Sequence, residues 1–125
     1  MSADLSNLTV GEFLHALRQV VAEKGASYVY PESEKRSDGA CSYWHNGQPS
    51  CIIGHALDAL GIVVPPFCEG KNAFTVLHDL GASEQVRWAA QKAQRAQDGG
   101  ASWGEALDRA EREVKVLATV EGLAS

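Results

Sequence analysis

Four side chains that could do chemistry lie close together, between positions 41 and 55. Cys41, His45, Cys51 and His55 follow the spacing C-x3-H-x5-C-x3-H. Thiolate and imidazole are ligands that tetrahedral zinc prefers, so a zinc site is the first hypothesis. Cys51 and His55 share one face of a helix at i, i+4, but Cys41 and His45 on a strand would lie about 13 Å apart. A break in that strand would be needed, and the short C-x2-C knuckle of many zinc sites is absent.

A cysteine nucleophile is the second hypothesis. Cys51 stands at the predicted start of a helix, where the helix dipole favours a thiolate, and His45 or His55 would be the base. Residues 50–57 resemble the nucleophile helix of papain-like and cell-wall peptidases, which also begins with cysteine. Those enzymes bring their histidine on a later strand, whereas here every residue after Gly61 is predicted to be loop or helix. His55 also shares the helix of Cys51, which is not the usual geometry of nucleophile and base.

The third interpretation is structural, and it is the one we adopt. Free cysteine is among the most buried residue types, so Cys51 is expected to be a small apolar residue at a helix start. His55 is then a hydrogen-bonded residue near the surface, and Cys41 lies half-buried in a strand. We therefore predict no catalytic residue and no cofactor, with the enzyme and the zinc-stabilised domain kept as alternatives.

Capping residues and apolar periodicity predict five helices around this segment. Each helix begins after a residue whose side chain can accept a backbone hydrogen bond, and most end at glycine. The predicted N-caps are Thr9 with Glu12 in a capping box, Ser50 for residues 51–60, Asn72 for a helix through residue 80, Ser83 for residues 84–98, and Ser102 with Glu105 in a second capping box.

Short β elements are predicted before the second helix. Residues 28–30 and 41–45 are aromatic or β-branched in part and favour strands. Asn46 and Gly47 form the strongest short-range turn signal, and residues 48–50 are expected to lead into the helix. The predicted fold is therefore mainly α (α+β), with about five helices and one small β-hairpin or two-stranded element. The last two helices should form an antiparallel hairpin, with small alanines on the packed face of residues 84–98.

Composition limits the function. The chain has 125 residues, enough for a single globular domain over residues 1–125, with residues 1–7 expected to form a flexible arm. Its formal charge of −5 argues against nucleic-acid binding, which needs clustered Lys and Arg. No apolar run is long enough for a membrane helix, and the N-terminus lacks the features of a signal peptide. An odd number of cysteines, three, fits a reducing cytoplasm better than a disulfide scaffold, and a short Cys41–Cys51 bridge across the turn is the sterically allowed alternative.

Several motifs occur in an order that resembles a known family. They are Y-V-Y at 28–30, C-S-Y at 41–43, N-G-Q-P-S-C-I-I-G-H-A-L at 46–57, Q-D-G-G at 97–100 and S-W-G-E-A-L at 102–107. In these residues the chain is similar to a family of small proteins from actinobacteria and their bacteriophages. The resemblance implies a cytoplasmic accessory protein, in the host cytoplasm if it is phage-encoded, and it carries no catalytic residues over to this chain.

These observations favour a protein-interaction module without catalytic activity. Its partner would be a host or phage protein, and an exposed aromatic residue would be the anchor, since tryptophan is enriched at interface hot spots. Trp88 and Trp44 are the candidates, together with Tyr43 beside Trp44. The alanine-rich hairpin is also compatible with homo-oligomerisation.

Overall fold

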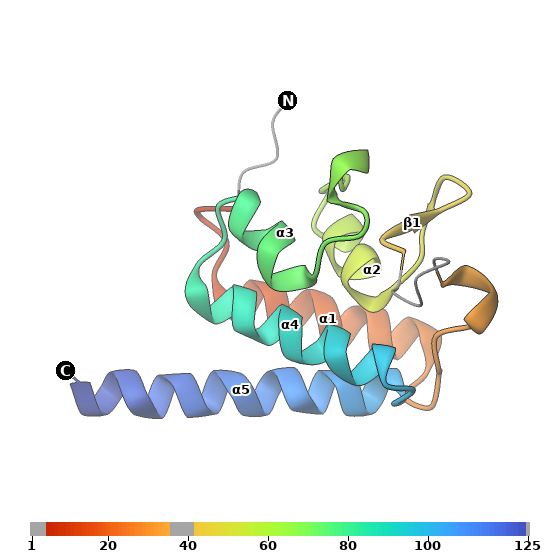
Figure 1. The fold of residues 1–125 in the computed structure, drawn as a ribbon. Helices are drawn as coiled ribbons and strands as arrows, with labels where there is room; N and C mark the ends of the chain where they lie inside the picture. Colours follow the sequence, from red (N-terminus) through yellow and green to blue (C-terminus); the bar gives the residue numbers. More distant parts are fainter. Residues whose placement is uncertain (1–4, 36–41, 125) are drawn as a thin grey trace.

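The described part of the chain in this computed structural model comprises residues 5–35 and 42–124. It contains five α-helices and one two-stranded antiparallel sheet, so the predicted mainly α fold is confirmed (Figure 1). In chain order the elements are α1 (Val10–Lys24), the 3-10 turn η1 (Glu32–Glu34), β1 (Trp44–His45), β2 (Gln48–Pro49), α2 (Ile52–Ala59), the 3-10 turn η2 (Pro66–Cys68), α3 (Ala73–Asp79), α4 (Glu84–Asp98) and α5 (Trp103–Ala124). None of the described helices is both long and apolar enough to cross a membrane.

The long helices form the base of the molecule. Helices α4 and α5 lie side by side in opposite directions, which confirms the predicted antiparallel hairpin, and α1 packs on both α5 and α2 (Figure 1). Ala89, Ala90 and Ala93 of α4 are fully buried, as are Ala106 and Ala110 of α5. These small side chains let the two helices approach closely. The alanine stripe is therefore used inside the molecule and is not an outer face that a second copy could cover.

The capping residues act largely as the sequence predicts. The Thr9 hydroxyl accepts from the Glu12 N–H at 3.0 Å, and the Glu12 carboxylate accepts from the Thr9 N–H at 2.9 Å. Asn72 and Ser83 cap α3 and α4. The second predicted capping box forms only in part: Ser102 accepts from the N–H of Glu105, whereas the Glu105 carboxylate pairs with Arg109. Before α1, Leu5 is buried and its N–H donates to the carbonyl of residue 80.

The predicted turn at Asn46 and Gly47 joins β1 to β2. Both residues have positive φ, 54° and 77°, which is the requirement of a type I′ hairpin turn. The register places Trp44 opposite Pro49. The predicted strand over 41–45 is thus reduced to Trp44–His45 among the described residues, and Cys41 lies outside them. Residues 48–49, expected to lead into the helix, instead form the second strand.

Two further predictions of local structure are wrong. Residues 28–30 form no strand, because the Tyr28 carbonyl accepts from the Trp103 N–H at 2.8 Å and the two rings pack edge to face with centroids 4.7 Å apart. Ser50 does not cap α2. Its N–H donates to the Tyr43 carbonyl at 2.9 Å, which extends the hairpin by one residue, and the cap is Cys51.

Three glutamines of α4 connect that helix to the N-termini of two others. The side-chain oxygen of Gln97 accepts from the N–H of Ile52, the first residue of α2, at 2.8 Å. Gln94 and Gln91 accept from the first two N–H groups of α3 at 2.6 Å and 2.9 Å. The initial N–H groups of a helix have no partner within it, so these glutamines satisfy donors that would otherwise be buried unpaired. Their spacing of three residues places all three side chains along one side of α4.

Helix α2 packs closely on the residue that precedes the hairpin. A Cβ atom added to Gly54 would collide with the carbonyl oxygen of Tyr43. Glycine at this position therefore permits close contact between the helix and the chain leading into β1. A similar contact occurs at Gly104, where a Cβ atom would lie 2.8 Å from the Cβ and carbonyl oxygen of Ala26. Gly54 and Gly104, which belong to the sequence motifs at 46–57 and 102–107, thus have a packing role.

Candidate functional site

Cys51, the candidate nucleophile, is fully buried at the start of α2. Its Sγ accepts from the N–H of Gly54 at 3.5 Å, and its own N–H donates to the Ser42 carbonyl at 2.9 Å. The thiol therefore acts as a helix cap and does not line an open cleft. This arrangement matches the structural interpretation of Cys51.

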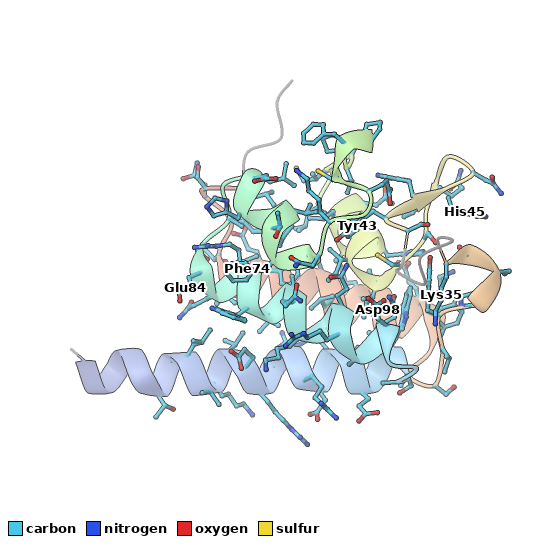
Figure 2. All side chains as sticks on the ribbon, in the orientation of Figure 1. Lys35, Tyr43, His45, Phe74, Glu84 and Asp98 are labelled. Carbon is cyan, nitrogen blue, oxygen red and sulfur yellow. The ribbon has the colours of Figure 1, made fainter. Side chains whose placement is uncertain are left out.

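The two candidate bases lie in different places. The Nδ1 atom of His55 is 3.0 Å from the Cys51 carbonyl oxygen, and because a carbonyl only accepts, Nδ1 must carry the proton of this hydrogen bond. The His55 ring also packs edge to face against Trp103, with centroids 5.2 Å apart. His45 is exposed on β1, and Figure 2 shows its side chain at the outer end of the hairpin. Neither orientation gives the nucleophile and base geometry of a cysteine hydrolase.

A metal centre has no complete ligand set in the described part of the chain, where no three His, Cys, Asp or Glu side chains come together to hold an ion. Of the four predicted ligands, Cys41 lies outside the described residues, and Cys51 and His55 are engaged with the backbone as given above. A polar cavity of about 280 Å³ between α1 and α2 is lined in part by Glu23, His55 and Asp58. Glu23 and Asp58, which supply the carboxylates of this cavity, are both exposed residues.

Tyr43, one of the three predicted binding residues, is fully buried (Figure 2). Its hydroxyl donates to the Lys71 carbonyl at 2.6 Å and accepts from Gln94 at 2.9 Å. The side chain thus connects the hairpin region, the start of α3 and α4. It stabilises the fold and presents no surface to a partner.

Trp44, the second predicted binding residue, lines an apolar groove. The groove has a volume of about 520 Å³ and lies between the hairpin and the segment that leads through η2. Its lining residues are Trp44, Gly47, Val63, Val64, Pro66 and Glu69. Val63, one of the lining residues, is 70% exposed, and Phe67, which follows Pro66 in the chain, is 66% exposed. We call these residues, with Phe67, the hairpin groove.

Glu69 holds the two walls of the hairpin groove together. One carboxylate oxygen accepts from the N–H of Tyr43 and the other from the N–H of Trp44, each at 3.0 Å. Tyr43 immediately precedes β1 and Trp44 is the first residue of that strand, so Glu69 satisfies two consecutive N–H groups where the strand begins. No local pattern in the sequence singles out Glu69, because its role depends on a contact across 25 residues.

Trp88, the third predicted binding residue, lies between α4 and α3. Its ring is tilted against Phe74 with centroids 4.7 Å apart, and it is half-buried. Together with Asn72, Gln91 and Arg95, these two rings line a cavity of about 250 Å³. Trp88 is therefore both an edge residue of the core and part of an accessible surface.

Burial changes the chemistry of the remaining described thiol. Cys68 is fully buried in η2. Burial raises the pKa of its thiol, Lys71 opposes this effect, and Asp79 and Glu69 reinforce it. A raised pKa leaves less thiolate near neutral pH, which makes Cys68 a poor nucleophile.

Comparisons of the chain with protein-family models, with curated proteins and with solved structures found no match.

Proposed function

We propose that the chain is a protein-interaction module, a cytoplasmic accessory protein of a phage or an actinobacterium, that holds an apolar side chain of a partner polypeptide in the hairpin groove. The observation that carries this proposal is the exposure of Val63 in a groove that Trp44 also lines, with exposed Phe67 next in the chain to the lining residue Pro66. Burying one large aliphatic or aromatic side chain of the partner stabilises a complex by roughly 1.5–3 kcal/mol. Single exposed apolar residues are common, but several around one concave surface are typical of an interaction site.

The edge of β1 favours a side chain over a strand as the occupant. A partner strand beside β1 would need the N–H group of Trp44, which already donates to Glu69. On the other strand of the sheet, Pro49 lies opposite Trp44 and has no N–H to donate to a strand added beside β2. Recognition at this position is therefore expected to come from side-chain burial.

Glu69 favours a basic residue beside the apolar anchor of the partner. It is the one charged residue among those that line the groove in the described structure. The nearby Lys71 ammonium is paired with Asp79 at 3.1 Å, so its charge is already balanced. We thus expect the partner segment to carry an aliphatic or aromatic side chain next to Lys or Arg, because complementary charge contributes to specificity.

A displayed peptide library tests this proposal. We would select random peptides on yeast for binding to the purified chain, then measure the affinity of the enriched peptides for Val63→Ser, Phe67→Ser and Val116→Ser. Val116 is a matched control because it is 56% exposed on α5 and outside the groove. The enriched peptides should combine an apolar and a basic residue, and the two groove variants should lower affinity about tenfold each.

Two results would contradict the proposal. One is selection of no peptide above background. The other is selection of peptides whose affinity is unchanged by both groove substitutions, which would place their binding elsewhere. A circular dichroism melt of each variant shows whether a loss of affinity comes from unfolding.

A further inference from the structure

The outward face of α4 carries positive charge that the described structure does not balance. Arg87, Lys92 and Arg95 lie on this face, and none of them is in an ion pair within residues 5–35 and 42–124. On α5, by contrast, Arg109 and Arg112 pair with carboxylates one turn earlier, at 3.3 Å and 2.9 Å. The chain as a whole has a formal charge of −5, so the positive charge of this face is opposite in sign to the net charge of the protein.

The carboxylates on the same helix stand at its two ends. Glu84 is in the first turn and Asp98 is the last residue, and Figure 2 shows them far apart along α4. Glu84 is favourably placed there for the helix dipole. The middle of the face therefore keeps its positive charge.

Aromatic rings lie next to Arg87 and Arg95. The guanidinium carbon of Arg87 is 5.0 Å from the centroid of the Phe74 ring, which in turn contacts Trp88. Gln91 fixes the position of Phe74 by accepting its N–H at 2.9 Å. The cavity of about 250 Å³ beside these rings, which Arg95 also lines, is of a size to hold one side chain. We call Phe74, Arg87, Trp88, Lys92 and Arg95 the α4 face.

We propose that the α4 face is a second docking surface, which binds an acidic polypeptide segment. One apolar or aromatic side chain of that segment lies in the cavity beside Trp88, and its carboxylates pair with Arg87, Lys92 and Arg95. Two properties of the face support this inference. Its positive charge is complementary to acidic groups, and arginine beside aromatic residues is typical of interface hot spots. The partner's acidic groups supply the counter-charges that the described chain does not provide.

Nucleic acid fits this surface less well than an acidic peptide. Phosphate backbones are bound by several Lys and Arg residues at once, and the overall charge of −5 repels a long polyanion. A short acidic segment meets only the local field, since charges beyond about 10 Å are screened at physiological salt.

Nuclear magnetic resonance with two designed peptides tests the proposal. The probes are acetyl-Glu-Glu-Phe-Glu-Glu-amide and the same peptide with Gln at each Glu position, titrated to millimolar concentration into ¹⁵N-labelled protein. The three tryptophans give separate indole N–H signals. We expect the acidic peptide to shift the Trp88 indole and the amides of α4, and to bind at least about fivefold more tightly than the neutral peptide.

Matched variants locate the charges that matter. Arg87→Gln with Arg95→Gln should weaken the acidic peptide about fivefold or more, whereas Arg109→Gln with Arg112→Gln on α5 should leave its affinity unchanged. Lys92→Gln removes a charge without removing a described aromatic contact, so it should still weaken binding about twofold even if the double variant unfolds.

Four results would overturn the proposal. The first two are equal binding of the acidic and neutral peptides, and shifts confined to the Trp44 indole. The others are tighter binding of a thymidine oligonucleotide than of the acidic peptide at the α4 face, and an absence of any shift at millimolar acidic peptide. The peptide selection at the hairpin groove uses other peptides and other variants, so the two proposals can fail separately.

Discussion

The side-chain oxygen of Gln97 lies 2.8 Å from the backbone nitrogen of Ile52 and accepts its N–H. The two residues are 45 positions apart, and Gln97 is almost fully buried. One side chain of α4 thereby satisfies a donor at the start of α2, the helix that follows the hairpin. The orientation of α2 relative to α4 therefore depends on a polar contact in the core.

Substituting Gln97→Leu should lower the free energy of unfolding by about 1–3 kcal/mol, because the Ile52 N–H would remain buried without an acceptor. Urea denaturation followed by circular dichroism measures this change. Gln19→Leu on the exposed side of α1 is the control and should change stability by no more than about 0.5 kcal/mol. Equal stability of Gln97→Leu and the parent chain would show that the contact contributes little.

Substituting Gly54→Ala should destabilise the chain by about 1–3 kcal/mol, since the new methyl group would force α2 away from the Tyr43 carbonyl. Gly11→Ala is the matched control. A Cβ atom there meets only the Thr9 hydroxyl, at 3.9 Å, so alanine should stabilise α1 by up to about 1 kcal/mol. Opposite signs for the two substitutions in thermal melts are the expected outcome, and a neutral Gly54→Ala would refute the packing role.

The buried thiols should react slowly in the native protein. In a Cys41→Ser background, Cys51 and Cys68 should resist a disulfide reagent near pH 8 and react fully in urea, because both are enclosed and burial raises the pKa of Cys68. Mass spectrometry of the modified peptides assigns a reaction rate to each cysteine. Fast native reaction at Cys51, with a rate that follows ionisation of a histidine, would restore the hypothesis of a cysteine enzyme.

Glu12 should make the stability of α1 depend on pH. Hydrogen bonds from the Thr9 backbone N–H and hydroxyl hold the pKa of this carboxyl below its ordinary value of 4.5. A lowered folded-state pKa means that the ionised form stabilises the native state above the unfolded pKa and that this gain is lost as the pH falls through the folded pKa. The melting temperature of the parent should therefore exceed that of Glu12→Gln at neutral pH and converge with it in acid. A gap that stays constant down to about pH 3 would contradict this assignment.

Local signals in the sequence predicted most of the secondary structure. Thr9, Asn72 and Ser83 cap their helices by contacts within three or four residues, so a sequence window contains both partners of each hydrogen bond. Asn46 and Gly47 form a turn for the same reason, because both tolerate positive φ. The prediction that Ser50 caps α2 failed because its N–H pairs with Tyr43 across the hairpin, which no local rule contains.

The sequence alone determined the number of helices, their approximate ends and the antiparallel pairing of the last two, since helical periodicity and capping are properties of neighbouring residues. Only the tertiary structure decided what the chemical residues do. Cys51 and Tyr43 became buried supports of the fold, while Trp44 and Trp88 line cavities. Burial and hydrogen bonding of a side chain depend on residues far away in the chain, such as Glu69 and Gln97, whose partners are 25 and 45 positions distant. That dependence on distant contacts is why the hairpin groove and the α4 face emerged only from the folded structure.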